Sequence, residues 1–165
     1  MRKKWQIKIV IVTLTANLLL TTLYGQQLGK VLPNITLQGV MDTTINVKNI
    51  KAKVILIDFW ASWCGPCFVA NKKLKKIYAK YDRTQFEIYA ISLDESKSAW
   101  LKAIDNQKLP WLHVRDGGNW NSKIANAWQI EAIPTSFIID TKGVIRYRNL
   151  PERLLISRIN SLLKE

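Results

Sequence analysis

The only two cysteines of this 165-residue chain, Cys64 and Cys67, are separated by two residues. An apolar run at residues 54–59 leads into the pair, and apolar residues at helical spacing follow it as far as Tyr81. A strand, a Cys-x-x-Cys pair and a helix suit a dithiol redox site, because the free N–H groups at a helix N-terminus stabilise a thiolate. Cys64 falls at that N-terminus, and Cys67 lies one turn further, within reach of a mixed disulfide formed at Cys64. The pair therefore predicts redox chemistry at a strand–helix junction.

A structural disulfide and a metal site are the alternative uses of these cysteines. Closing so short a loop removes little entropy from the unfolded chain, so a purely structural bridge would stabilise the fold only slightly. Two cysteines and the single histidine, His113, cannot supply a Cys₄ or Cys₂His₂ zinc site; we expect His113 to be a packed or surface residue. We therefore expect no metal and no cofactor other than a redox-active disulfide between Cys64 and Cys67.

The first 25 residues have the pattern of a secretory signal. Basic residues occupy the start, and residues 9–20 are mostly apolar, which is short for a membrane span of about 20 residues. Gly25 is a small residue at a plausible cleavage point, but Leu23, three positions before the proposed cut, is not the small residue usually found there. We predict a signal peptide or an uncleaved membrane anchor at residues 1–25 and one domain at residues 26–165. Either form places the domain in the periplasm or another compartment outside the cytoplasm.

The formal net charge of +13 is compatible with anionic lipid or acidic partners. Lysine and arginine are scattered along the chain, and the densest group, at residues 72–80, has the helical spacing of a solvated helix face. The sequence therefore predicts no nucleic-acid partner, and it predicts membrane contact only through residues 1–25, if that segment is not cleaved.

The remaining pattern predicts an α/β fold. Its order is two short strands, then strands alternating with helices, then a hairpin and a closing helix, which implies a mixed central sheet with helices on both faces and an N-terminal β-hairpin extension. The expected strands are residues 31–37, 44–47, 54–59, 86–93, 111–114, 135–139 and 144–148. The expected helices are residues 67–81, 95–107, 122–128 and 151–163.

Two motifs resemble those of a known family. Residues 59–67, Phe-Trp-Ala-Ser-Trp-Cys-Gly-Pro-Cys, together with Ile133-Pro134-Thr135, are similar to the motif pair of the thioredoxin superfamily. The two leading strands and the long segment between residues 93 and 133 resemble the exported, TlpA-type branch of thiol–disulfide oxidoreductases. The resemblance covers residues 29–165 and implies a thioredoxin-like fold and an enzyme that acts on protein thiols and disulfides.

The resemblance also implies roles for the cysteine motif. Cys64 would be the nucleophile and Cys67 the resolving thiol. Gly65 and Pro66 form the dipeptide that in thioredoxins accompanies a reducing potential of about −270 mV. The resemblance therefore implies a dithiol reductase of protein disulfides, supplied with electrons by a membrane thiol carrier because an oxidising compartment cannot keep it reduced.

Further residues complete the predicted site. In the family the Ile133–Pro134 peptide bond is cis and lies beside the disulfide, where the backbone of Ile133 can pair with an extended substrate segment. Trp63 offers substrates a flat apolar contact. Asp58 lies inside an apolar strand, so burial should raise its pKa and allow it to exchange a proton with Cys67 through water; the alternative for Asp58 is a loop-facing or capping role.

The chain departs from many exported relatives in two places. The family's Glu and Pro, three and five residues after the second cysteine, are Ala70 and Lys72 here. The missing Glu removes a feature of cytochrome c maturation reductases, and the missing Pro predicts a straighter helix. The alternatives to a reductase are an oxidase or isomerase of exported thiols, a non-catalytic peptide-binding module, and a peroxiredoxin-related peroxidase. A peroxidase would need Thr-x-x-Cys, whereas Ser62 lies two residues before Cys64.

Overall fold

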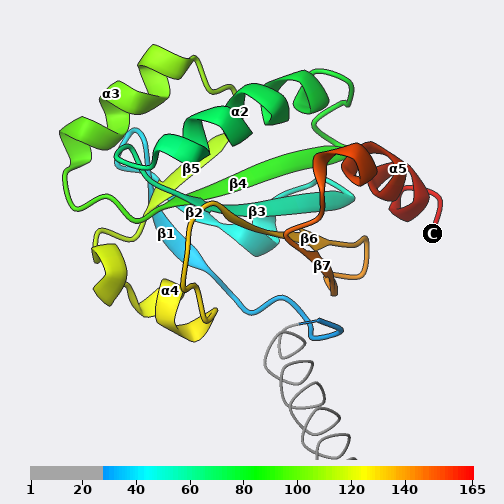
Figure 1. Ribbon diagram of the computed structural model, residues 1–165. Helices are drawn as coiled ribbons and strands as arrows, with labels where there is room; N and C mark the ends of the chain where they lie inside the picture. Colours follow the sequence, from blue (N-terminus) through cyan, green and yellow to red (C-terminus); the bar gives the residue numbers. More distant parts are fainter. Residues whose placement is uncertain (1–27) are drawn as a thin grey trace, which may run out of the picture.

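The computed structural model describes residues 28–165, which form one mixed sheet with the strand order β2-β1-β5-β4-β3-β6-β7 (Figure 1). The predicted leader at residues 1–25 lies outside the described residues. Within residues 28–165 no helix is long and apolar enough to cross a membrane. The strands are β1 (Thr36–Gly39), β2 (Thr44–Asn46), β3 (Val54–Trp60), β4 (Phe86–Ser92), β5 (Leu112–Arg115), β6 (Thr135–Ile139) and β7 (Ile145–Arg148). The helices are η1 (Val47–Asn49), α2 (Gly65–Tyr78), α3 (Lys97–Gln107), η2 (Asn119–Asn121), α4 (Lys123–Ala127) and α5 (Glu152–Leu162).

Strand β3 lies near the middle of the sheet. It runs parallel to β4 and antiparallel to β6, and β4 runs parallel to β5. Every residue of β3 and β4 is buried, which explains why both strands are mostly apolar in the sequence. The antiparallel β1–β2 hairpin joins the edge of the sheet beside β5, as the predicted N-terminal extension requires.

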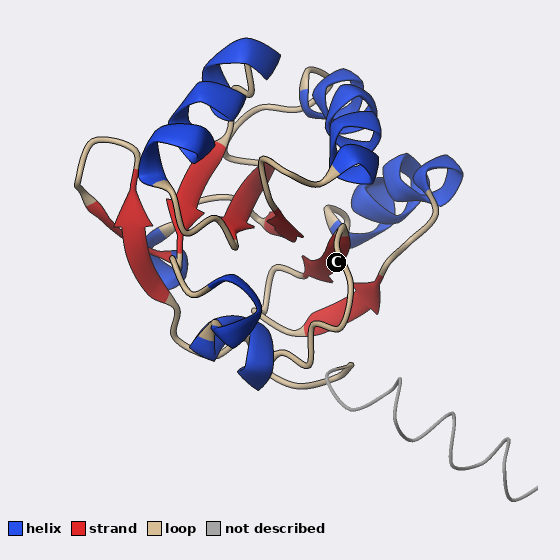
Figure 2. Ribbon diagram, turned by 60° about the vertical axis from the view of Figure 1, so that its left-hand side comes forward, coloured by secondary structure: helices blue, strands red, loops and turns tan. Residues whose placement is uncertain are grey.

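Helices cover both faces of the sheet, which confirms the predicted fold class. Helices α2, α3 and α5 lie on one face and α4 lies on the other (Figure 1, Figure 2). Successive residues of β3 point to opposite faces, so Leu56 and Trp60 pack in the core beneath α2, whereas Ile57 and Phe59 pack in the second core with Trp128. The crossovers through α2 and α3 step across the sheet in the same direction, so the usual right-handed connection places both helices on one face.

The disulfide and the start of the described chain lie at opposite ends of the sheet. Strand β3 ends at Trp60, and the cysteine motif follows it. At the other end, the N–H of Gly29 donates to the C=O of Ile145 at 2.8 Å. Ile145 pairs with Ile139, which pairs with Ile55 near the beginning of β3.

The prediction of a strand at residues 31–37 is wrong, because the first strand is Thr36–Gly39. Leu32 and Ile35 are buried, but Pro33 between them has no N–H to donate, and this segment forms only an isolated bridge from Val31 to Val144. The helix expected at residues 67–81 begins at Gly65 and ends at Tyr78. The other expected boundaries differ from the observed ones by at most two residues.

Candidate active site

Cys64 and Cys67 form a disulfide at the N-terminus of α2, with an S–S distance of 2.06 Å and a Cα–Cα distance of 5.3 Å. Cys64 is the N-cap residue, and its Sγ accepts a hydrogen bond from the backbone N–H of Cys67 at 3.1 Å. Pro66 occupies the first turn of α2, where its missing N–H leaves no hydrogen bond unmade. The helix therefore begins with an N–H group directed at the sulfur of Cys64, which is the arrangement that favours a thiolate there.

The surface around the disulfide is open on one side. Cys64 is 5% exposed and Cys67 is 1% exposed, so Cys64 is the more accessible of the two sulfur-bearing residues. Gly65 is exposed, and a Cβ added to it would meet no atom within 4 Å. An incoming sulfur therefore has room to approach over the start of α2.

The Ile133–Pro134 peptide bond is cis, as the family resemblance implied. The C=O oxygen of Ile133 lies 3.7 Å from the Sγ of Cys64. This is a contact and not a hydrogen bond, because a disulfide sulfur carries no proton. Within residues 28–165, neither the N–H nor the C=O of Ile133 is paired with another backbone group. The structure thus brings free backbone donors and acceptors next to the disulfide.

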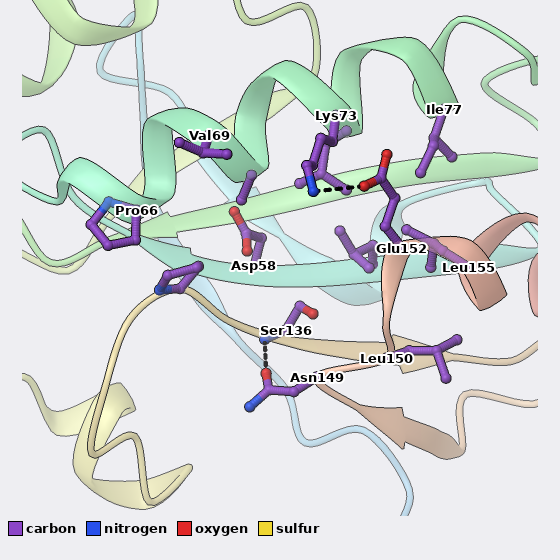
Figure 3. Close-up of a pocket in the computed structure, with 14 residues that line it drawn as sticks. Asp58, Pro66, Val69, Lys73, Ile77, Ser136, Asn149, Leu150, Glu152 and Leu155 are labelled. Atoms are coloured by element: carbon purple, nitrogen blue, oxygen red, sulfur yellow. Dashed lines mark hydrogen bonds and ion pairs between the residues drawn. The ribbon is translucent and has the colours of Figure 1, made fainter.

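Asp58 is buried on the side of β3 that faces α2, and its side chain is 3% exposed. Its carboxyl points toward α2 and into a cavity of about 330 Å³ (Figure 3). Pro66, the neighbour of Cys67, and Pro134 line the same cavity, and an ion pair of 2.9 Å between Lys73 and Glu152 joins α2 to α5 across its lining. The cavity therefore connects the Asp58 carboxyl to the immediate surroundings of the cysteine motif.

Burial raises the pKa of the Asp58 carboxyl from 3.8 to about 7. Among the residues that the structure describes, this carboxyl has no ion-pair or hydrogen-bond partner that would hold it ionised. A carboxyl with a pKa near 7 can both accept and return a proton at neutral pH. Asp58 lies inside β3 and is buried, so it neither faces a loop nor caps a helix.

Comparison with known proteins assigns the family. A family model described as thioredoxin-like matches residues 51–145. The chain belongs to this thioredoxin-like family. It is 30% identical over 119 residues to the thiol–disulfide oxidoreductase ResA of Bacillus cereus, an alignment that covers 72% of this chain and 67% of the relative. The observed disulfide and this relative together make the protein a thioredoxin-like thiol–disulfide oxidoreductase.

Solved structures of thiol–disulfide oxidoreductases have the same fold as this chain. A thiol–disulfide oxidoreductase from Bacteroides fragilis is 28% identical, with a TM-score of 0.74 over 81% of this chain and 99% of that one. The thioredoxin domain of a thiol–disulfide oxidoreductase from Bacteroides vulgatus is 26% identical, with a TM-score of 0.75 over 82% of this chain and 97% of that one. The thioredoxin-like fold expected from the sequence is confirmed.

Asp94 is a buried member of this thioredoxin-like site that the sequence analysis did not identify. Its carboxylate accepts the N–H of Ser62 at 2.9 Å, the hydroxyl of Ser62 at 2.6 Å and the hydroxyl of Ser92 at 2.6 Å. Asp94 therefore fastens the loop before Trp63 to the end of β4. Since Ser62 and Asp94 are 32 residues apart and meet only after β3 and β4 pair, no local sequence signal could have revealed the contact.

Replacing Asp94 with alanine is expected to destabilise the oxidised protein by about 2–4 kcal/mol, because it leaves buried hydroxyl and N–H groups of Ser62 and Ser92 without an acceptor. Urea unfolding monitored by circular dichroism measures the change. Asp105→Ala is the matched control, because Asp105 is exposed on α3 and should change stability by less than about 0.5 kcal/mol. Equal effects of the two variants would show that the Asp94 contacts do not fix the loop.

His113 is packed and not part of the disulfide site, in line with the sequence-based expectation. It is buried between the rings of Trp60 and Trp111, with centroid distances of 5.7 and 5.8 Å. Burial lowers the pKa of His113 to about 4, so this histidine is neutral at physiological pH. It therefore adds no positive charge beneath the cysteine motif.

Proposed function

We propose that the protein is an exported dithiol reductase of protein disulfides, with Cys64 as the nucleophile and Cys67 as the resolving thiol. The observation that carries the proposal is the position of Cys64 at the N-cap of α2, where its sulfur accepts the N–H of Cys67. This hydrogen bond and the helix dipole favour the thiolate of Cys64 in the reduced protein. Cys64 is also the less buried of the pair, as an attacking sulfur must be.

The proposed reaction has two exchanges. The Cys64 thiolate attacks one sulfur of the substrate disulfide, which forms a mixed disulfide and releases the other substrate sulfur as a thiolate. Cys67 then loses its proton and attacks the Cys64 sulfur, which closes the Cys64–Cys67 disulfide and releases the second substrate sulfur. Two electrons pass from the protein dithiol to the substrate, which ends with two thiols.

Asp58 is proposed to accept the proton of the Cys67 thiol during the second exchange and to return it to the departing substrate thiolate. Its raised pKa, near 7, suits both directions of transfer. The cavity that Asp58 shares with Pro66 has room for the water that would carry the proton.

Substrate binding is proposed to use Trp63, Gly65, Pro66 and the Ile133–Pro134 segment. The unpaired N–H and C=O groups of Ile133 support pairing with an extended substrate strand beside the reacting sulfur. The exposed surfaces of Trp63, Gly65 and Pro66 border the path to Cys64.

The direction of electron flow is proposed from the dipeptide between the cysteines. Strongly oxidising dithiol proteins owe their high potential to extra stabilisation of the thiolate in the reduced form. Here the dipeptide is Gly65-Pro66, which carries no charged side chain, and the single histidine of the chain is neutral and packed elsewhere. In the reduced protein, the Cys64 thiolate is therefore stabilised by little other than the helix N-terminus. A weakly stabilised reduced form gives electrons away readily, which favours a reductase. A protein with the predicted leader at residues 1–25 works outside the cytoplasm, so we propose a membrane thiol carrier as its electron donor.

The direction is tested by equilibrating the protein with dithiothreitol or glutathione redox buffers and measuring the fraction oxidised. The expected midpoint potential lies near about −270 mV, and the reduced protein is expected to reduce insulin. A midpoint near about −120 mV would instead identify an oxidant of exported thiols.

A further inference from the structure

Two tryptophans, one of them the residue that precedes Cys64, lie in contact with each other. The ring centroids of Trp63 and Trp120 are 6.0 Å apart, with an angle of 54° between the planes. Trp63 is 50% exposed and Trp120 is 45% exposed, so half of each large ring system faces solvent. Trp63 precedes Cys64 directly in the chain, so this aromatic pair includes the residue next to the attacking cysteine. Core or surface packing is the only role that the sequence suggests for Trp120.

The turn that carries Trp120 has a fixed shape. Gly117 has a φ of +79°, and a Cβ on Gly118 would lie 2.7 Å from the Cα of Ser122, so both positions require glycine. Ser122 ends the turn, and its hydroxyl oxygen caps α4 by accepting the N–H of Ala125 at 2.9 Å. Trp120 is therefore held in place by its turn, and its exposure is not the result of a loose loop.

One network positions both rings. The Arg115 guanidinium donates to the C=O groups of Asp94 and Glu95 at 3.2 and 3.0 Å and lies directly against Gly117. Asp94 in turn holds Ser62, the neighbour of Trp63. The ends of β4 and β5 thus fix Trp120 and Trp63 relative to each other and to Cys64.

A substrate that forms a mixed disulfide with Cys64 must bring its chain to this pair. The Cα atoms of two disulfide-bonded cysteines lie about 5.5–6 Å apart, and consecutive Cα atoms are about 3.8 Å apart. The residue next to the substrate cysteine is therefore at most about 10 Å, Cα to Cα, from Cys64, whose neighbour in the chain is Trp63. The bond to Cys64 makes this surface continuous with the interface that the reaction itself creates.

We propose that Trp120, together with Trp63, selects polypeptide substrates that carry a large apolar or aromatic side chain next to the reacting cysteine. Half-exposed tryptophans supply a large apolar area at a low entropic cost, and ring contacts add to the energy of burial. The net charge of +13 disfavours a basic residue as the partner of the rings. This inference rests on the proposed attack by Cys64. It adds that the side chain next to the substrate cysteine determines how well the substrate is bound.

The test uses the reduced full-length protein and symmetrical disulfides of the peptide Gly-X-Cys-X-Gly, with X as Phe, Ser or Arg. Glutathione disulfide serves as a small reference because it carries no apolar side chain next to its cysteine. Rate constants come from acid-quenched samples in which the released peptide thiol is separated by chromatography. Trp120→Ala removes the ring, and Trp120→Phe retains an aromatic surface. Val31→Ala is the matched control, because Val31 is an exposed apolar residue at the opposite end of the sheet.

The wild-type protein and Val31→Ala are expected to react about three- to tenfold faster with the Phe peptide than with the Ser peptide. Trp120→Ala is expected to lose this preference while its rate with glutathione disulfide and its midpoint potential stay unchanged, and Trp120→Phe is expected to keep part of it. An unchanged preference in Trp120→Ala, no preference in the wild type, or a preference for the Arg peptide would overturn the inference and leave the proposed function standing. A wild-type protein that reacts with none of the disulfides, glutathione disulfide included, would overturn the proposed function as well.

Discussion

Cys67→Ser is expected to turn the catalyst into a trap in which substrates accumulate as mixed disulfides on Cys64. The first exchange needs only the Cys64 thiolate, whereas release needs the sulfur of Cys67, which the helix holds at bonding distance. An intramolecular thiol of this kind has a very high effective concentration, so turnover of insulin should fall by at least about 1,000-fold. Non-reducing gels and mass spectrometry of the trapped adducts provide the measurement and identify the physiological substrates at the same time.

The matched control for this trap is Cys64→Ser, which should bind no substrate covalently and should also be inactive. Trapping by Cys64→Ser, with none by Cys67→Ser, would reverse the proposed roles of the two cysteines. Full complementation of a deletion strain by a protein that carries both substitutions would show that the protein acts as a peptide-binding module without redox chemistry.

Asp58→Asn is expected to change how stability depends on pH. The folded protein holds Asp58 with a pKa of about 7, against 3.8 in the unfolded chain. Between these two values the unfolded chain has released a proton that the folded protein still holds, so the free energy of unfolding decreases as pH rises and the full loss is present above about pH 7. A difference of about three pKa units corresponds to about 4 kcal/mol.

Urea unfolding of the oxidised protein at pH 4 and pH 8 measures this contribution. Between pH 4 and pH 8, the free energy of unfolding of the wild type should fall by about 4 kcal/mol more than that of Asp58→Asn. Asp82→Asn is the control, because Asp82 is exposed and its replacement should leave the wild-type pH dependence in place. Parallel stability curves for wild type and Asp58→Asn would show that Asp58 ionises normally despite its burial.

The same substitution tests the proposed proton transfer. Asp58→Asn should slow the release of substrate from the mixed disulfide by about 100-fold at pH 7, with little effect on the initial attack by Cys64. Rapid-quench measurement of the mixed disulfide separates the two steps. Equal rates of release in the two proteins would remove Asp58 from the mechanism.

Most of the fold could be predicted because β3 and β4 are central parallel strands. Both are buried on both faces, so each appears in the sequence as a mostly apolar run, interrupted by Asp58 in β3 and by Glu87 in β4. The segment around Leu32 and Ile35 misled the prediction, since an irregular chain that buries the same residue types looks like a strand from composition alone. The apolar spacing predicts that α2 begins at residue 67, two residues after its observed start at Gly65, although Pro66 is well suited to the first turn of a helix.

The residues of the candidate site also fall into those that the sequence could predict and those that it could not. The disulfide between Cys64 and Cys67 and the burial of Asp58 could be predicted from the motif and from the apolar strand that precedes it, and the cis Ile133–Pro134 bond followed from the family resemblance. Asp94 and Trp120 could not be identified, because their partners, Ser62 and Trp63, lie far from them in the sequence. Only the pairing of β3, β4 and β5 brings these residues together.

The chain joins the domain at Gly29, at the far end of the sheet from the disulfide. The seven residues of β3 span about 20 Å at the usual rise of a strand. If the segment before Gly29 fixes the protein to a surface, the length of the sheet separates Cys64 from that surface, and Cys64 faces away from it. Folded substrate proteins would then approach Cys64 from the side away from that surface.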